Sequence, residues 1–191
     1  MKSCFLFGHS DAPQDIQSGI EAAVERQYLN YGIRQYYVGG YGSFDRMAAS
    51  ALKSAKKRYQ DMSLYLLLPY HPAERPVETP EGFDGTFYPP LEKVPRRYAI
   101  VRANHYMIET CDSLICYVHH IGNTRTLLEY AQRRAKKGEL FLENLPPSIF
   151  KHHVLTRHLF IHSRHIYGPT TTMPGTGNKE VNSDLSLRAD S

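Results

Sequence analysis

Three glycines within four residues, Gly39, Gly40 and Gly42, constrain the fold of this chain more than any other feature of its sequence. The segment before them, residues 33–38, is rich in β-branched and aromatic residues, as buried strands are. After them, apolar residues recur at helical spacing over residues 44–55. The pattern therefore predicts a glycine-rich turn between a strand and a helix.

Such a turn can bind an anion, because its backbone N–H groups lie at the positive end of a helix dipole and glycines permit close approach. Ser43 follows the glycines and would lie beside the same anion. The spacing matches neither the dinucleotide-binding fingerprint nor the P-loop, so a tight turn without a ligand is the alternative. Asp45, in the first helical turn, either interacts favourably with the helix dipole or accepts hydrogen bonds from a ribose or a base.

The order strand, turn, helix recurs along the chain. An apolar run over residues 4–7 ends at Gly8, His9 and Ser10, and Pro13 then stands where helices often begin. Further apolar runs cover residues 64–69, 113–118 and 140–142, and helical spacing is seen over residues 95–108 and 127–135. We therefore expect an α/β fold: a Rossmann-like, doubly wound, mainly parallel five-stranded sheet with helices on both faces.

In such a sheet the strand-to-helix turns meet at one edge, where open α/β sheets bind their ligands. Tyr70 follows the third predicted strand, and it either stacks on a base or caps the core. Gly122 and Asn123 follow the fourth strand. His119 and His120 are adjacent at that strand end and should point to opposite faces, so we expect no shared metal there.

The connection over residues 72–94 is proline-rich, has no periodicity and carries acidic and aromatic residues at its centre. Long connections of this kind are usually lids or disordered segments. The aromatic residues favour a lid, which would cover the same edge of the sheet. Arg96 and Arg97 then open a helix at the end where the dipole disfavours cations. This placement favours an anionic partner, and solvated arginines beside the acidic connection are the alternative.

Composition limits the class of protein. With 191 residues, 41% hydrophobic and 22% charged, the chain is typical of a soluble globular protein, and we expect one domain over residues 1–145. The net charge of +4 is not concentrated in a basic stripe, so the sequence has no strong nucleic-acid signature. No apolar run is long enough to span a membrane and no signal peptide is recognisable, so we expect a cytoplasmic protein.

The remaining features are the cysteines and the C-terminal segment. Cys4, Cys111 and Cys116 fit neither a disulfide framework nor a zinc cluster, and we expect reduced core thiols. Residues 146–191 are histidine-rich and then polar, and we expect a partly disordered extension. Its histidines lack acidic or cysteine partners, so we expect no metal there. The sequence leaves open whether the chain forms a homo-oligomer.

The motifs, taken in order, resemble those of a known superfamily. They are Gly8-His9, then Gly39-Gly40-Tyr41-Gly42 with Phe44-Asp45, then Leu68-Pro69-Tyr70, and finally Asn104, Met107-Ile108 and Cys111-Asp112. This set resembles the SLOG superfamily, which joins the DNA-processing protein DprA, the Lonely Guy phosphoribohydrolases and the small YpsA-like bacterial proteins. The resemblance is greatest to the YpsA-like branch. It implies a Rossmann-like sheet whose glycine turns hold nucleotides or molecules derived from them.

This chain departs from the enzymes of that superfamily. Their glycine pair after strand four is replaced by His119-His120, and Arg125 and Thr126 stand where acidic residues are expected. Ala103 stands in place of an arginine, with Arg102 one position earlier. We therefore expect binding of a nucleotide-derived signal, such as an ADP-ribose or cyclic-nucleotide type, by a sensor or sequestering protein with no catalytic residue, cofactor or metal. The expected ligand-binding residues are Gly8, His9, Ser10, Gly39, Gly40, Gly42, Ser43, Asp45, Tyr70, Arg102, Gly122 and Asn123, with Arg102 or Arg96 as counter-charge.

Two other functions are compatible with the sequence. The first is a phosphoribohydrolase-like enzyme on nucleoside monophosphates, whose acid site is rebuilt from Glu129, Asp45 or the carboxylates of residues 72–94. The second is a regulator that acts through a protein partner contacted by the histidine-rich extension.

Overall fold

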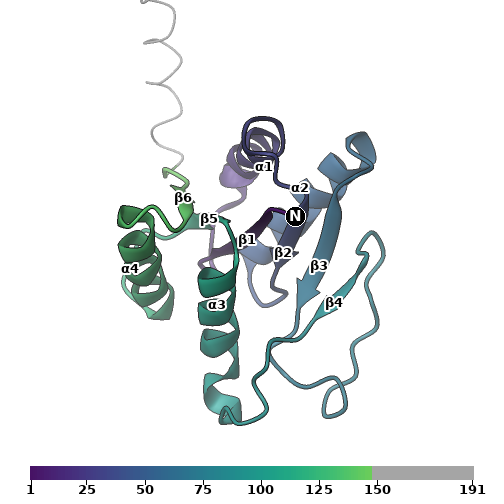
Figure 1. Cartoon of the computed structure of the whole chain (residues 1–191), viewed down its shortest axis with the longest axis vertical. Helices are drawn as coiled ribbons and strands as arrows, with labels where there is room; N and C mark the ends of the chain where they lie inside the picture. The colour runs from purple at the N-terminus through teal and green to yellow at the C-terminus, as the bar shows by residue number, and fades with distance from the viewer. Residues whose placement is uncertain (148–191) are drawn as a thin grey trace, which may run out of the picture. The chain divides into compact units, whose positions relative to one another are not determined.

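The computed structural model describes residues 1–147, which form a sheet of six parallel strands with helices on both faces (Figure 1). The strands are β1 (Ser3–Gly8), β2 (Gln35–Val38), β3 (Ser63–Leu67), β4 (Gly85–Phe87), β5 (Ser113–Tyr117) and β6 (Phe141–Asn144). The helices are α1 (Gln17–Tyr31), α2 (Ser43–Arg58), α3 (Ala99–Thr110) and α4 (Asn123–Lys136), and short 3₁₀ turns, Gln14–Ile16 and Arg96–Tyr98, precede α1 and α3. The Rossmann-like prediction is confirmed, with one more strand than expected.

Side chains of the central strands alternate between two cores, because successive residues of a strand point to opposite faces. In β1, Cys4 and Leu6 join the core beneath α1 and α2, whereas Phe5 and Phe7 join the core beneath α3 and α4. All four side chains are buried. This burial on both faces explains why the strand reads as a continuous apolar run.

The extra strand, β4, comes from the connection that was expected to be a lid. It pairs in parallel with β3, so that Tyr65 lies opposite Gly85 and Leu67 opposite Phe87. The Asp84 carboxylate fixes its start, because it accepts the Leu64 N–H at 2.7 Å and binds the Lys56 ammonium. Pairing satisfies the exposed edge of β3. The lid prediction is therefore wrong for this segment, because none of residues 72–94 lines the pocket that β1, the end of β3, α3 and α4 form at the carboxyl edge of the sheet.

The strand order β4-β3-β2-β1-β5-β6 defines the place where a ligand can enter. The chain builds outward from β1 to β4 and then returns to place β5 on the other side of β1. Turns leaving β1 and β5 therefore run to opposite faces and open a crevice at their carboxyl ends.

Two other sequence predictions can be compared with residues 1–147. None of the helices in this range is both long and apolar enough to cross a lipid bilayer. All three cysteines are buried and unpaired, as expected of core thiols. The predicted histidine-rich extension lies outside the described residues, apart from its first two.

Candidate functional site

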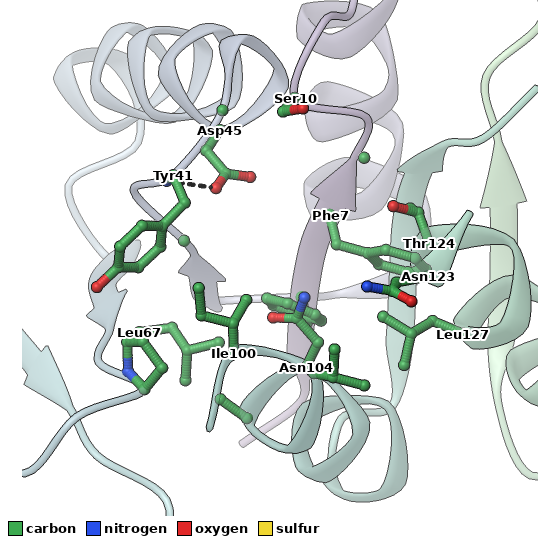
Figure 2. A pocket seen from close by; sticks show the side chains of 17 residues that line it. Phe7, Ser10, Tyr41, Asp45, Leu67, Ile100, Asn104, Asn123, Thr124 and Leu127 are labelled. Carbon is green, nitrogen blue, oxygen red and sulfur yellow. Dashed lines mark hydrogen bonds between the residues drawn. The ribbon is translucent and has the colours of Figure 1, made fainter. Parts of the chain in front are cut away.

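A pocket of about 220 Å³ lies at the carboxyl edge of the sheet, beside the crevice between β1 and β5 (Figure 2). Its apolar part comes from β1, the end of β3, α3 and α4. Its polar part comes from the turns, from the starts of α2 and α4, and from Asn104 of α3. The lining residues are Phe5, Phe7, Gly8, Ser10, Gly39, Tyr41, Gly42, Asp45, Leu67, Pro69, Ile100, Val101, Ala103, Asn104, Asn123, Thr124 and Leu127.

The turns after β1 and β2 meet at one end of this pocket. The Ser43 N–H donates to the Ser10 carbonyl at 2.8 Å, and the Ser43 hydroxyl donates to the Ala12 carbonyl at 2.8 Å. A Cβ atom on Gly42 would lie 2.7 Å from the Ser10 Cα, so only glycine permits this contact. The glycine at position 42 is thus explained by the packing of one turn against the other.

The glycine-rich turn holds a carboxylate. Asp45 accepts the Tyr41 N–H at 2.9 Å, and its carboxylate lies against Gly39 (Figure 2). Burial raises the pKa of Asp45 to about 6, and the Tyr41 N–H and the nearby Arg46 only partly oppose this effect. Because Tyr41 and Ser43 already donate within the protein, this turn offers fewer N–H groups to an anion than the sequence suggested.

The opposite side of the pocket is formed by the N-terminus of α4, which favours anions. Asn123 and Thr124 begin α4 and lie across the pocket from Asp45 (Figure 2). Gly122 caps this helix with a φ of 153°, a conformation that favours glycine, and no side chain of the described residues caps it. The first N–H groups of a helix have no partner within the helix and carry the positive end of its dipole. The pocket therefore has a negative side at Asp45 and a positive side at the start of α4.

His9 lies behind the pocket wall and does not line the cavity. Its side chain is only 3% exposed, and its Nε2 accepts the N–H groups of His119 at 3.0 Å and His120 at 3.2 Å. The ring also stacks on that of His120, with 3.4 Å between ring centroids. His9 thus connects the turn after β1 to the turn after β5.

The structure brings together half of the residues expected from sequence. Those that line the pocket are Gly8, Ser10, Gly39, Gly42, Asp45 and Asn123. Those that do not are His9, Gly40, Ser43, Tyr70, Arg102 and Gly122. Arg102 is exposed on α3, and among the residues that the structure describes no arginine, lysine or histidine lines this cavity.

Tyr70 and Arg96 line a neighbouring polar pocket of about 190 Å³. The guanidinium groups of Arg96 and Arg75 lie 5.2 and 5.9 Å from the centre of the Tyr70 ring. The ring is therefore already engaged by cations. Stacking of Tyr70 on a base in the main pocket has no support from this arrangement.

Sequence reasoning did not assign Tyr41, Asn104 and Thr124, which supply much of the remaining polar lining. A signal for Asn104 was present, because it lies one residue after Ala103 and three before Met107 on the inward side of its helix. A polar residue beside an apolar stripe is unusual and indicates a cavity or a buried partner.

Comparison with known proteins leaves the family open. No protein-family model matches the chain, and no curated protein is significantly similar to it. The evidence for function is therefore the pocket itself.

Proposed function

We propose that the pocket binds a nucleotide or a nucleotide-derived molecule, with the anionic group at the first turn of α4 and the sugar or base toward Asp45. The observation that carries this proposal is the polarity of the cavity, with a carboxylate on one side and a helix N-terminus on the other. A ligand with a phosphate at one end and hydroxyl or N–H donors at the other complements both sides.

The rest of the lining supports the same class of ligand. Phe5, Phe7 and Leu67 form an apolar part against which a planar base can pack. The Asn104 side-chain amide offers both a donor and an acceptor to the edge of a base. The resemblance to SLOG proteins points to nucleotide-derived ligands as well, and a signal of the ADP-ribose or cyclic-nucleotide type remains the proposed example.

Binding without turnover is the primary proposal, because few carboxylates are within reach. Glu129 does not line the cavity and pairs with Arg125 at 3.2 Å. The carboxylates of residues 72–94 are also absent from its lining. These findings remove two of the three carboxylate sources considered for a phosphoribohydrolase site.

Asp45 supports hydrolysis of an N-glycosidic bond as the second candidate function. Its pKa of about 6 would let it hold a proton near neutral pH and give it to the departing base, while water adds to the anomeric carbon as the C–N bond breaks. Release of free base from a nucleoside monophosphate, lost in Asp45→Asn, would favour this candidate. Stoichiometric binding with the ligand recovered intact would favour the first.

The primary proposal is tested by thermal shift and calorimetry with AMP, ADP-ribose, cyclic nucleotides and the matching nucleosides. A ligand that binds only the native state raises its stability, by about 2.7 kcal/mol at a hundredfold excess over Kd. Absence of stabilisation by every compound at millimolar concentration would contradict the proposal.

Paired variants locate the anionic group. Thr124→Val removes one hydroxyl from the start of α4, and we expect it to weaken phosphate-bearing ligands roughly tenfold while leaving nucleosides unchanged. Arg102→Ala is the matched control, since this arginine is exposed and does not line the cavity. A large loss of affinity in Arg102→Ala with none in Thr124→Val would place the anion elsewhere.

A further inference from the structure

The turns after β1 and β5 are joined by a cluster of three titratable side chains, His9, Asp11 and His120. Their candidate ligand atoms lie within 4.8 Å of one another, and two histidines with a carboxylate can hold a transition metal. The hydrogen bonds of His9 speak against that use. Because Nε2 accepts two backbone N–H groups, the proton of the neutral ring sits on Nδ1, and no lone pair is left for a metal.

The stacking of the two rings gives a second reason. The planes of His9 and His120 differ by only 12°, with 3.4 Å between ring centroids. Nitrogen lone pairs lie in the plane of the ring, so those of two stacked rings lie in nearly parallel planes and do not converge on one ion. The cluster must be explained by its hydrogen bonds.

We propose that neutral His9 is a proton-sensitive clamp, which positions the first turn of α4 and releases it when Nε2 is protonated. The effect on ligand binding rests on the proposed function, whereas the clamp itself does not. His9 is a positioning residue in this proposal, because it acts on the pocket wall through the backbone of its neighbours.

The hydrogen bonds explain how a proton would open the clamp. A proton on Nε2 turns the acceptor into a donor that faces the N–H groups of His119 and His120, so both bonds are lost. His120 is followed after two residues by Asn123, which with Thr124 lines the pocket. Loss of the clamp therefore loosens the wall that is proposed to hold the anionic group.

Burial, assisted by the neighbouring histidines, favours the neutral form of His9. The groups that face it are His119 and His120 on the turn after β5, Asp11 on its own turn, and Tyr117 of β5, whose ring meets it edge-on. Burial lowers the pKa of His9, proximity to His120 and His119 lowers it further, and Asp11 opposes this.

His120 behaves in the opposite way, and this sets the order of protonation. The Ile121 carbonyl and the Asp11 carboxylate, 3.2 Å away, raise the pKa of His120. As the pH falls, His120 is charged first, and its charge delays protonation of His9. The clamp therefore holds at neutral pH and opens below the ordinary histidine value of about 6.5.

A second anchor limits how far the turn can move. The His119 Nε2 lies 2.6 Å from the Leu145 carbonyl and donates to that oxygen, a hydrogen bond that does not involve His9. Release should therefore affect residues 120–124 more than the end of β5.

Histidine-selective ¹⁵N NMR on the full chain tests the clamp without a ligand. We expect His9 to show a protonated Nδ1 and an unprotonated Nε2 at pH 7.5, and to titrate below His120. The protection factors of the His119 and His120 amides, which correct for intrinsic exchange, should fall roughly tenfold as His9 becomes charged. A His9 that carries its proton on Nε2 at pH 7.5, or amides that stay equally protected, would overturn the proposal.

Two substitutions separate the clamp from a merely structural role. In His9→Gln the side-chain oxygen can accept the same N–H groups but cannot be protonated, so the turn should stay protected at every pH. His9→Ala should lose the protection at every pH. If His9→Gln keeps the pH dependence of the wild type, His9 is not the switch.

The same variants distinguish failure of the clamp from failure of the proposed function. For a nucleotide that binds, we expect affinity to fall at least fivefold more in the wild type than in His9→Gln between pH 7.5 and the pH at which NMR shows His9 to be charged. Asp45, with a pKa of about 6, titrates in both proteins, so its effect cancels in this comparison. Equal losses in both proteins would overturn the coupling to the pocket. If no nucleotide binds at any pH, the proposed function fails, and the amide protection still decides the clamp.

Discussion

Replacing Asp45 by asparagine should stabilise the protein at neutral pH. The amide oxygen of asparagine can still accept the Tyr41 N–H, but the half-buried negative charge is removed. No cation lines the pocket among the described residues, so little compensates that charge in the wild type. Asp45 thus lies at a position where a neutral side chain would make the fold more stable, a cost that agrees with the proposed role of Asp45 in ligand binding.

The magnitude follows from the pKa of the group. Burial raises the pKa of Asp45 from 3.8 to about 6, and each pH unit between these values corresponds to about 1.4 kcal/mol, which gives an upper bound of about 3 kcal/mol. Partial exposure of the side chain reduces this, and we expect about 1–2 kcal/mol at pH 7.5.

The pH dependence of the stability difference between the wild type and Asp45→Asn provides a check on the sign of this effect. Because the folded-state pKa lies above the unfolded one, the stability contributed by protonated Asp45 is fully present below pH 3.8 and is lost as the pH rises through about 6. The wild type should therefore lose stability relative to Asp45→Asn between these values. Above pH 7 the difference between the two proteins should be constant.

Urea denaturation of both proteins at a series of pH values from 4 to 8 measures the difference. The m-values should agree, so that the midpoints report stability alone. Asp84→Asn is the control of opposite sign: burial raises the pKa of Asp84, but Lys56 and the Leu64 N–H together outweigh it and hold the pKa below its usual range. This substitution should therefore destabilise the protein, by an amount that stays nearly constant from pH 4 to 8, because the stability contributed by ionised Asp84 is lost only below about pH 3.8. A wild-type protein that is more stable than Asp45→Asn at pH 7.5, or a difference that does not change with pH, would refute the reasoning.

Two further predictions concern packing. Gly42→Ala should lower the free energy of unfolding by about 1–3 kcal/mol, because its Cβ would lie 2.7 Å from the backbone of Ser10. Gly19→Ala on α1, whose Cβ would meet nothing within 4 Å, should raise the free energy of unfolding by about 0.5–1 kcal/mol in the same thermal or urea assay. The thiols of Cys4, Cys111 and Cys116 should react with a disulfide reagent at pH 8 only as fast as the protein unfolds, since all three are buried and burial raises their pKa. Rapid labelling of the native protein would show that these thiols are not buried in the core.

The sequence predicted the parts of the fold that follow from local patterns. The apolar runs of β1, β2, β3 and β5 and the helical spacing of α2, α3 and α4 were sufficient, because buried strands and amphipathic helices carry their own periodicity. β4 was missed because Gly85–Phe87 is only three residues long, and its pairing depends on a distant side-chain contact between Asp84 and Lys56.

The position of the site in the fold was predictable from the sequence, but the arrangement of charged and polar groups around the pocket was not. Glycines and strand ends located the edge of the sheet, whereas the direction of the Asp45 side chain depends on the conformation of the turn that presents the Tyr41 N–H. His9 was assigned to a ligand for the same reason: the sequence shows that it follows a strand, but only the structure shows that its ring points into the neighbouring turn.

The contact between Ser10 and Gly42 has a consequence for redesign. Since main-chain atoms form that end of the cavity, exchanging side chains there cannot widen it without separating the two turns. The adjustable wall is α3, where Ile100 is partly exposed and Asn104 offers an amide. Attempts to make the protein accept a bulkier guest should begin on that helix and leave the glycine-rich corner as it is.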